Sequence, residues 1–151
     1  MGRKKQNYQK YIRAGIVQLS EVLPFATQKK RKEYGKPSPI REEKEFLGHN
    51  VYMDSIRYQT FAKKGCKCVR CGVEGEYFAV ERQNNADTAR YHLNLYAMKH
   101  NKEVLMTVDH IVPASQGGKR EVDNLQPMCI ICNAKKSDMS DQSDKERFYV
   151  R

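Results

Sequence analysis

The chain has 151 residues, of which 28 are Lys or Arg and 18 are Asp or Glu, so its formal net charge is +10. This length suits one ordinary domain, and the lack of any run of about 18 apolar residues excludes a hydrophobic membrane-spanning helix. No apolar stretch of signal-peptide type follows the basic first residues, so we expect a protein of a reducing cytosol. Five cysteines are then expected as thiols or metal ligands rather than as disulfides.

Positive charge is concentrated in the first third of the chain. Residues 1–48 carry 12 Lys or Arg against 5 Asp or Glu, whereas residues 49–151 carry 16 against 13. Two basic runs stand out, at residues 3–5 and 29–32. Nucleic acid is the natural partner of such runs, because Lys and Arg that bind phosphates release condensed counterions. A solvated tail that serves solubility is the alternative interpretation.

The N-terminal 48 residues are expected as a basic, mostly helical arm. Apolar residues at helical spacing predict a helix over residues 8–23, weakened by Gly15 and ended by Pro24. Residues 24–48 are rich in proline and charge, which predicts an irregular segment or linker.

The following residues, 49–138, predict an α+β domain. A short helix is expected over residues 54–64, with Asp54 or Ser55 as its N-cap and Gly65 at its end. Three segments rich in β-forming residues then predict strands, at residues 77–81, 91–96 and 104–108.

The end of the chain is predicted to be a turn, a helix and a tail. Gly117 and Gly118 mark the turn, and a short polar helix is expected from Cys132. Residues 139–151 are expected as an exposed C-terminal tail.

Four of the five cysteines form two C-x-x-C pairs, Cys68 with Cys71 and Cys129 with Cys132. Paired knuckles of this kind are typical of a tetrahedral Zn²⁺ site with metal–sulfur bonds of about 2.3 Å. The 57 residues between the pairs exceed the roughly 15–20 of a simple zinc ribbon, so one structural zinc is expected to clamp a longer insert. Two unrelated pairs of buried thiols are the alternative, and Cys66 is left over as a spare small residue.

A second group of residues has the chemistry of a hydrolytic site. A strand, a glycine loop, a second strand and a helix are expected in about 30 residues. Asp109 and His110 end the first of these strands, and Asn133 lies in the first turn of the helix. Carboxylate and amide oxygens suit a hard cation such as Mg²⁺ or Mn²⁺, and a neutral imidazole can deprotonate water near pH 7. Adjacent residues on an extended chain point to opposite faces. A bend at the strand end is therefore expected to bring the side chains of Asp109 and His110 to one site.

The order of these motifs resembles the HNH, or ββα-metal (His-Me finger), endonuclease family. The matching pattern is D-H-I-x-P-x-S-x-G-G followed by N-L-Q-x-x-C-x-x-C-N-x-x-K-S, and the likeness covers residues 68–138. It is the form of the family with two zinc knuckles. The resemblance implies a small zinc-clamped ββα core.

The resemblance also implies a role for each matching residue. Asp109 corresponds to a metal ligand, His110 to the general base, and Asn124 to the central Asn that holds the loop backbone and thereby orients the histidine. Asn133 stands where many members have His, which favours a hard ion such as Mg²⁺ or Mn²⁺ over a softer one. The structural zinc ligands correspond to Cys68, Cys71, Cys129 and Cys132.

The implied activity is metal-dependent hydrolysis of DNA, with double-stranded DNA as the expected partner and 5′-phosphate and 3′-hydroxyl ends as products. The cytosol of a bacterium or of a phage-infected host is the expected location, and a monomer and a homodimer are both compatible with the sequence. A non-catalytic zinc-dependent nucleic-acid-binding module and an RNA-cleaving enzyme are the alternatives.

The remaining candidates have weaker support. Lys119, Arg120 and Lys136 flank the site, either as DNA contacts or as surface charges. His92 is expected in a structural rather than a catalytic role.

Overall fold

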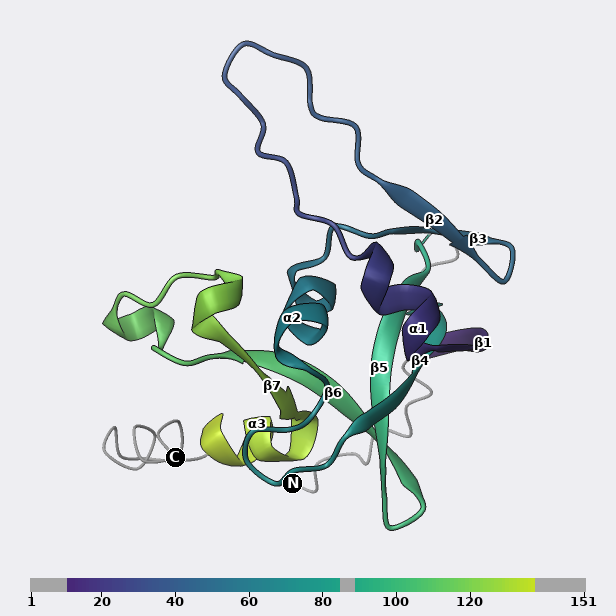
Figure 1. Cartoon of the computed structure of the whole chain (residues 1–151), viewed down its shortest axis with the longest axis vertical. Coiled ribbons are helices and arrows are strands. Elements are labelled where there is room, and N and C mark those ends of the chain that lie inside the picture. Colours follow the sequence, from purple (N-terminus) through teal and green to yellow (C-terminus); the bar gives the residue numbers. More distant parts are fainter. Residues whose placement is uncertain (1–10, 85–88, 138–151) are drawn as a thin grey trace, which may run out of the picture.

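The computed structural model describes residues 11–84 and 89–137, so the basic run at 3–5 and the predicted tail at 139–151 lie outside the described residues. An antiparallel five-stranded sheet of order β1-β4-β5-β6-β7 forms the body, and a β2–β3 hairpin stands beside it (Figure 1). The strands are β1 (Tyr11–Gln18), β2 (Glu43–Phe46), β3 (His49–Tyr52), β4 (Gly75–Gln83), β5 (His92–Lys99), β6 (Lys102–His110) and β7 (Leu125–Cys129).

Three α-helices and three short 3₁₀ segments complete the described chain. The helices are α1 (Leu19–Val22), α2 (Ile56–Lys64) and α3 (Ile130–Ser137), and the 3₁₀ segments are Leu23–Phe25, Ala114–Gln116 and Val122–Asn124. This mixed architecture is the α+β class predicted from the sequence. In the described residues, no helix is both long and apolar enough to cross a bilayer.

The predicted helix over residues 8–23 is wrong for most of its length. Residues 11–18 form strand β1, which pairs with β4, and only Leu19–Val22 is α-helical. Two effects favour the strand: β-branched Ile12, Ile16 and Val17 lower helix propensity, and β1 supplies hydrogen-bond partners to the edge of β4. The described N-terminal segment is therefore mostly strand and irregular chain rather than helix.

At Gly15, β1 lies against the β2–β3 hairpin. A Cβ atom at this position would meet Leu47 Cδ1 at 2.7 Å, and the β1–β4 register shifts between Arg13 and Gly15. The neighbour is the end of an exposed, flexible side chain, so a larger residue at position 15 would displace the Leu47 side chain rather than the backbone.

The helix α2 covers the inner face of the sheet and fills the core. It begins at the N-cap Ser55, whose hydroxyl accepts from Arg57 N at 3.3 Å, and it ends at Gly65, as predicted. Its buried Tyr58 and Phe61 pack edge-on against Phe78 of β4.

The predicted strands at 77–81, 91–96 and 104–108 are present as parts of β4, β5 and β6. The long strand β6 changes partner along its length: residues 102–105 pair with β5, and residues 106–110 pair with β7. The α3 helix follows β7 directly and contacts both β6 and β7. The β6–β7–α3 unit is therefore an extension of the main sheet.

Candidate active site and cysteine cluster

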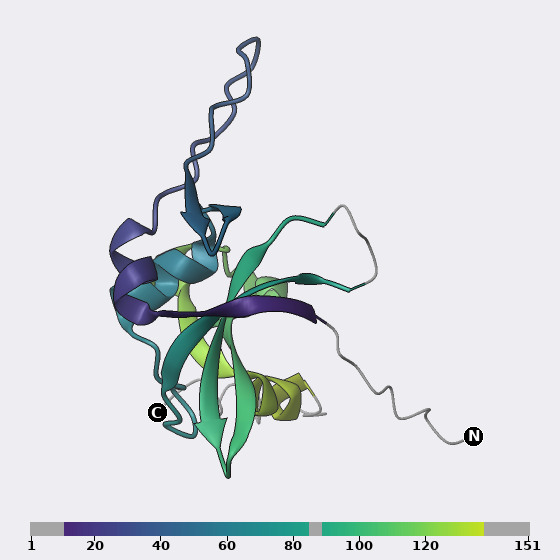
Figure 2. The ribbon, with the colours of Figure 1, turned by 90° about the vertical axis from the view of Figure 1, so that its right-hand side faces the viewer.

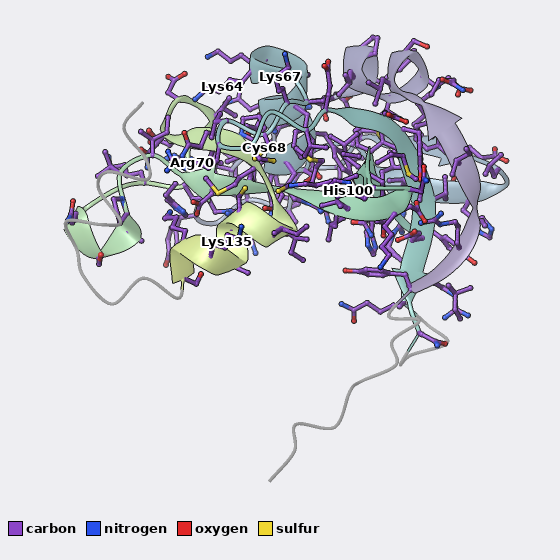
Figure 3. All side chains as sticks on the ribbon, turned by 90° about the horizontal axis from the view of Figure 1, so that it is seen from below. Lys64, Lys67, Cys68, Arg70, His100 and Lys135 are labelled. Carbon is purple, nitrogen blue, oxygen red and sulfur yellow. The ribbon has the colours of Figure 1, made fainter. Side chains whose placement is uncertain are left out.

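The two C-x-x-C pairs meet in space, as Figure 3 shows for Cys68 beside α3. All four Sγ atoms lie within 4.8 Å of one another, and the Cys71 and Cys129 sulfurs are 3.7 Å apart. Tetrahedral zinc with bonds of about 2.3 Å requires sulfur–sulfur separations of about 3.8 Å. The cluster therefore has the dimensions of a zinc site.

Local backbone geometry forms each knuckle. The first is a tight turn in which Cys68 N donates to Val73 O at 2.8 Å and Gly72 N donates to Cys68 O at 3.0 Å. The second is the β7–α3 junction, where Cys132 N donates to Cys129 Sγ at 3.4 Å. A bond from Val69 N to Pro127 O, at 3.0 Å, joins the first knuckle to β7.

The ionisation of the four thiols is linked. Burial raises the pKa of Cys68, but backbone hydrogen bonds from Cys71 and Cys129 outweigh it and lower that pKa to about 7. Burial, with the neighbouring Cys129 thiol, raises the pKa of Cys132. One thiolate thus opposes the ionisation of the next, and a bound divalent cation offsets this repulsion. The donor set fits the zinc expected from the sequence.

Two residues of β6 face α3. Thr107 and Asp109 are two positions apart on the strand and share one face. Asn133 Nδ2 donates to Thr107 Oγ1 at 3.0 Å, and the Thr107 hydroxyl donates to Met128 O at 2.7 Å. The structure therefore brings Asp109 and Asn133 to one β6–α3 interface, with Asn133 held through Thr107.

A lysine that contacts DNA is expected to be exposed, whereas Lys136 is buried. Its side chain is only 10 % exposed, and its ammonium group forms an ion pair with the Asp109 carboxylate, which is 15 % exposed. Asn133 and Lys136 are three residues apart on one face of α3, so both point toward β6. The cationic partner of Asp109 in this structure is thus a lysine of the chain itself.

Asn124 fixes the loop that leaves β6. Its amide oxygen accepts from Val112 N at 2.9 Å, and its Nδ2 donates to Val112 O at 3.1 Å and to Lys119 O at 2.8 Å. Its own backbone oxygen accepts from Ile111 N at 2.8 Å. The side chain thereby holds both ends of the loop, and the side chain and backbone of Asn124 together hold the two residues that follow His110.

The loop needs a glycine at position 118. A Cβ atom there would lie 1.8 Å from Val112 O, a distance that no side chain tolerates. Gly117 precedes it with φ near +85° and ends the 3₁₀ turn Ala114–Gln116. The predicted Gly117–Gly118 turn is present for these reasons.

His110 ends β6, and the bend expected at the strand end follows directly at Ile111 and Val112. It pairs with Leu125 in a ladder that records no register shift from Met106 to His110. The bend thus lies just after the ladder rather than within it. The imidazole is half-buried, and within the described parts of the chain it has no hydrogen-bond partner.

Two residues that support this region were missed by the sequence reasoning. Lys64 of α2 donates to Asp123 O at 3.1 Å and to Leu125 O at 2.6 Å, and so ties α2 to the chain on both sides of Asn124. No sequence signal points to this long-range contact. Thr107 was detectable, because it lies two residues before Asp109 and must share its face in a strand.

The other residues singled out from the sequence take no part in the contacts between β6, α3 and the loop. The Lys119 and Arg120 side chains are exposed on the loop. His92 lies in β5 with its ring edge-on to Tyr11, and burial lowers its pKa. Cys66 is buried apart from the four clustered thiols, and burial raises its pKa to about 11.

Residues 98–139 match the sequence model of a family described as HNH endonuclease. This segment is an HNH domain. It contains β6, the loop held by Asn124, β7 and α3, whereas the first cysteine pair lies outside the match. No curated protein and no solved structure matches the chain. The HNH domain indicates a nuclease-type function.

Proposed function

We propose that the protein is an endonuclease that hydrolyses DNA phosphodiester bonds with the help of one divalent cation. The observation that carries the proposal is the β6–α3 interface of the HNH domain. Across it Asp109 of β6 pairs with Lys136 of α3, and Asn133 of α3 bonds to Thr107 of β6. His110 ends the same strand, next to a loop fixed by Asn124.

In the proposed reaction, His110 is the general base. Its imidazole accepts a proton from water, and the resulting hydroxide attacks the phosphorus atom while the bond to the 3′-oxygen breaks. The departing 3′-oxygen takes up a proton from a solvent water. Asn124 is a positioning residue that fixes the backbone after His110. The products are a 5′-phosphate and a 3′-hydroxyl end.

Asp109 and Asn133 are the residues that would hold the divalent cation. Their carboxylate and amide oxygens are hard donors that suit Mg²⁺ or Mn²⁺. The ion pair with Lys136 supports this assignment, because it places a cationic group against the Asp109 carboxylate. A bound cation would stabilise the negative charge that develops on the phosphate oxygens.

Two features support DNA as the substrate. The chain carries a net charge of +10. Exposed basic side chains also lie near the HNH domain: Figure 3 shows Lys67 next to Cys68, with Lys135 on α3. Such cations neutralise phosphates without reading sequence.

The test is cleavage of supercoiled plasmid by wild type and by His110→Asn, with Mg²⁺, Mn²⁺ or EDTA. We expect metal-dependent nicking or linearisation by wild type and a loss of at least about a hundredfold in the variant, because an amide is not a base. The same change at His100, in the β5–β6 turn, is the matched control and should retain activity.

Three outcomes decide between the candidates. Equal cleavage by His110→Asn and wild type would remove His110 as the base. Plasmid binding without cleavage in any metal would favour the non-catalytic zinc-dependent binding module. A matched RNA substrate cleaved in preference to DNA would favour the RNA-cleaving alternative.

A further inference from the structure

Residues 28–41, here called the arm, project from the molecule as one long loop with two limbs (Figures 1 and 2). They lie between the 3₁₀ segment Leu23–Phe25 and β2 and contain no strand or helix. Figure 1 shows that the arm leaves the end of the molecule opposite to the β5–β6 turn. A projecting segment of this shape buries little apolar surface and therefore contributes little to the stability of the fold. Its presence calls for a role other than packing.

The base of the arm is fixed to the body. Thr27 N donates to Met53 O at 3.0 Å, and Met53 N donates to Glu42 O at 2.9 Å, so one residue holds both limbs. Arg41 adds a bidentate contact to buried Asp54, with its Nε 2.9 Å from Oδ2 and its Nη2 2.6 Å from Oδ1.

The hairpin beside the base is fixed to the main sheet. Arg90, just before β5, pairs with Glu43 at 2.5 Å and stacks 3.7 Å from the Tyr52 ring centroid. The His49 ring stacks on Tyr91 with centroids 3.7 Å apart. The arm therefore leaves the body at a defined place rather than from a loose linker.

The arm carries more positive charge than its ion pairs neutralise. It contains six Lys or Arg against one Glu. Lys36 pairs with Glu33 at 2.6 Å, and Arg41 pairs with Asp54. The four cations of the run at 29–32 are exposed, and within the described residues no ion pair engages them. Lys29, Lys30 and Lys32 line one shallow pocket with Arg41.

The tip of the arm presents an aromatic side chain to solvent. Lys36 N donates to Glu33 O at 3.2 Å and closes the turn, and Tyr34 within it is fully exposed. A lone exposed Tyr is ordinary on a surface, but here it stands between the cations Lys32 and Lys36 at the end of a projection. Cations interleaved with an aromatic ring form a surface that suits phosphates together with a sugar or base edge.

We infer that the arm is a second DNA-binding element, which grips the duplex at a distance from the HNH domain. The run at 29–32 neutralises phosphates, and Tyr34 contacts the sugar or base edges of a groove. The inference depends on the proposed function in one respect, which is that this function identifies DNA as the binding partner.

The test measures binding of full-length, zinc-loaded protein to a 30-base-pair duplex without Mg²⁺ or Mn²⁺, so that cleavage plays no part. Lys30→Ala/Lys32→Ala should weaken binding about tenfold at 0.1 M salt. It should also reduce the slope of log Kd against log salt by about 2, because each phosphate contact contributes about 0.9. Lys99→Ala/Lys102→Ala, at the distant β5–β6 turn, removes the same charge and should change both quantities far less.

Tyr34→Ala separates groove contact from simple charge attraction. We expect a loss of affinity of about fivefold with an unchanged salt slope, because the ring carries no charge. An equal effect of the Lys30/Lys32 and Lys99/Lys102 pairs would overturn the inference in favour of a general charge effect. Unchanged affinity and slope in the arm variants would also overturn it and direct the search to an acidic protein partner. Neither result would bear on cleavage by the HNH domain.

Discussion

At the scale of single residues, the pairing of Asp109 with Lys136 has the clearest bearing on function. A lysine that is 10 % exposed loses much of its hydration, and this loss is tolerated because a carboxylate faces it. The pair keeps Asp109 oriented toward α3. A divalent cation that uses the same carboxylate must share it with this ammonium or displace it.

Gly118 gives the sharpest prediction at this scale. In Gly118→Ala the new methyl group would collide with Val112 O, so the loop between β6 and β7 must move. We expect plasmid cleavage to fall at least tenfold. The melting temperature should fall by only a few degrees, because the loop contributes little to the core.

The control for this variant is Ser115→Ala, a change in the same loop at an exposed position. It should leave cleavage within about twofold of wild type, as surface substitutions usually do. Full activity of Gly118→Ala would show that the loop does not position His110.

At the scale of elements, the sequence predicted α2, β4, β5 and β6 well, because each has local signals. Ser55 caps α2, Gly65 ends it, and the strands are rich in β-forming residues. The apolar spacing of residues 11–18 fits both a helix and a strand, and the helix was predicted. Long-range pairing with β4 makes this segment a strand. Local pattern carries no information on such a partner.

The same limit applies to the candidate site. The motifs placed Asp109, Asn124 and Asn133 in one unit, because their spacing follows from the β6–β7–α3 order. The ion pair of Lys136 and the tie from Lys64 depend on which side chains face each other across elements, and spacing alone does not give this. The absence of a bulge at His110 is likewise a property of the ladder with β7.

A pH-dependent prediction belongs to the base of the arm. The hydrogen bond from Arg41 lowers the pKa of Asp54 against the opposing effect of burial. A carboxyl group whose pKa is lower in the folded state stabilises the fold above its unfolded pKa of about 3.9, and this stabilisation is lost as the pH falls through the folded value. At pH 7, Asp54→Asn should lower the free energy of unfolding by about 1–2 kcal/mol.

Urea unfolding of wild type and Asp54→Asn between pH 3 and pH 7 checks this prediction. The difference between the two proteins should be constant above about pH 5 and shrink below about pH 4. A difference that stays the same throughout would mean that the charge of Asp54 contributes nothing. Glu33→Gln, which breaks the exposed pair with Lys36, is the control and should have little effect at any pH.

At the scale of the whole molecule, the cysteine cluster joins two segments that are far apart in the sequence. It links the turn after α2 to the β7–α3 junction, and α3 carries two residues of the candidate site. Metal binding at such a cluster is coupled to folding. The stability of the HNH domain and the placement of Asn133 are therefore expected to depend on one metal.

The corresponding prediction uses Cys129→Ser and Cys66→Ala. Cys129→Ser should lose the bound zinc, lower the melting temperature by at least about 10 °C and abolish cleavage, because a structural site with three thiolates holds zinc poorly. Cys66→Ala should keep one zinc per chain, since its sulfur is not in the cluster. Metal analysis by mass spectrometry and thermal unfolding provide the two measurements. Full zinc content in Cys129→Ser would contradict the assignment.

The position of the second cysteine pair has a consequence for the order of events during synthesis. Cys68 and Cys71 leave the ribosome long before Cys129, and the last cysteine adjoins Asn133 in α3. Until that helix emerges, the nascent chain holds half of the cysteine cluster and lacks Asn133 of the proposed catalytic site. The same eight-residue helix completes both centres, so a partly made chain bound near nucleic acid is expected to be unable to cut it.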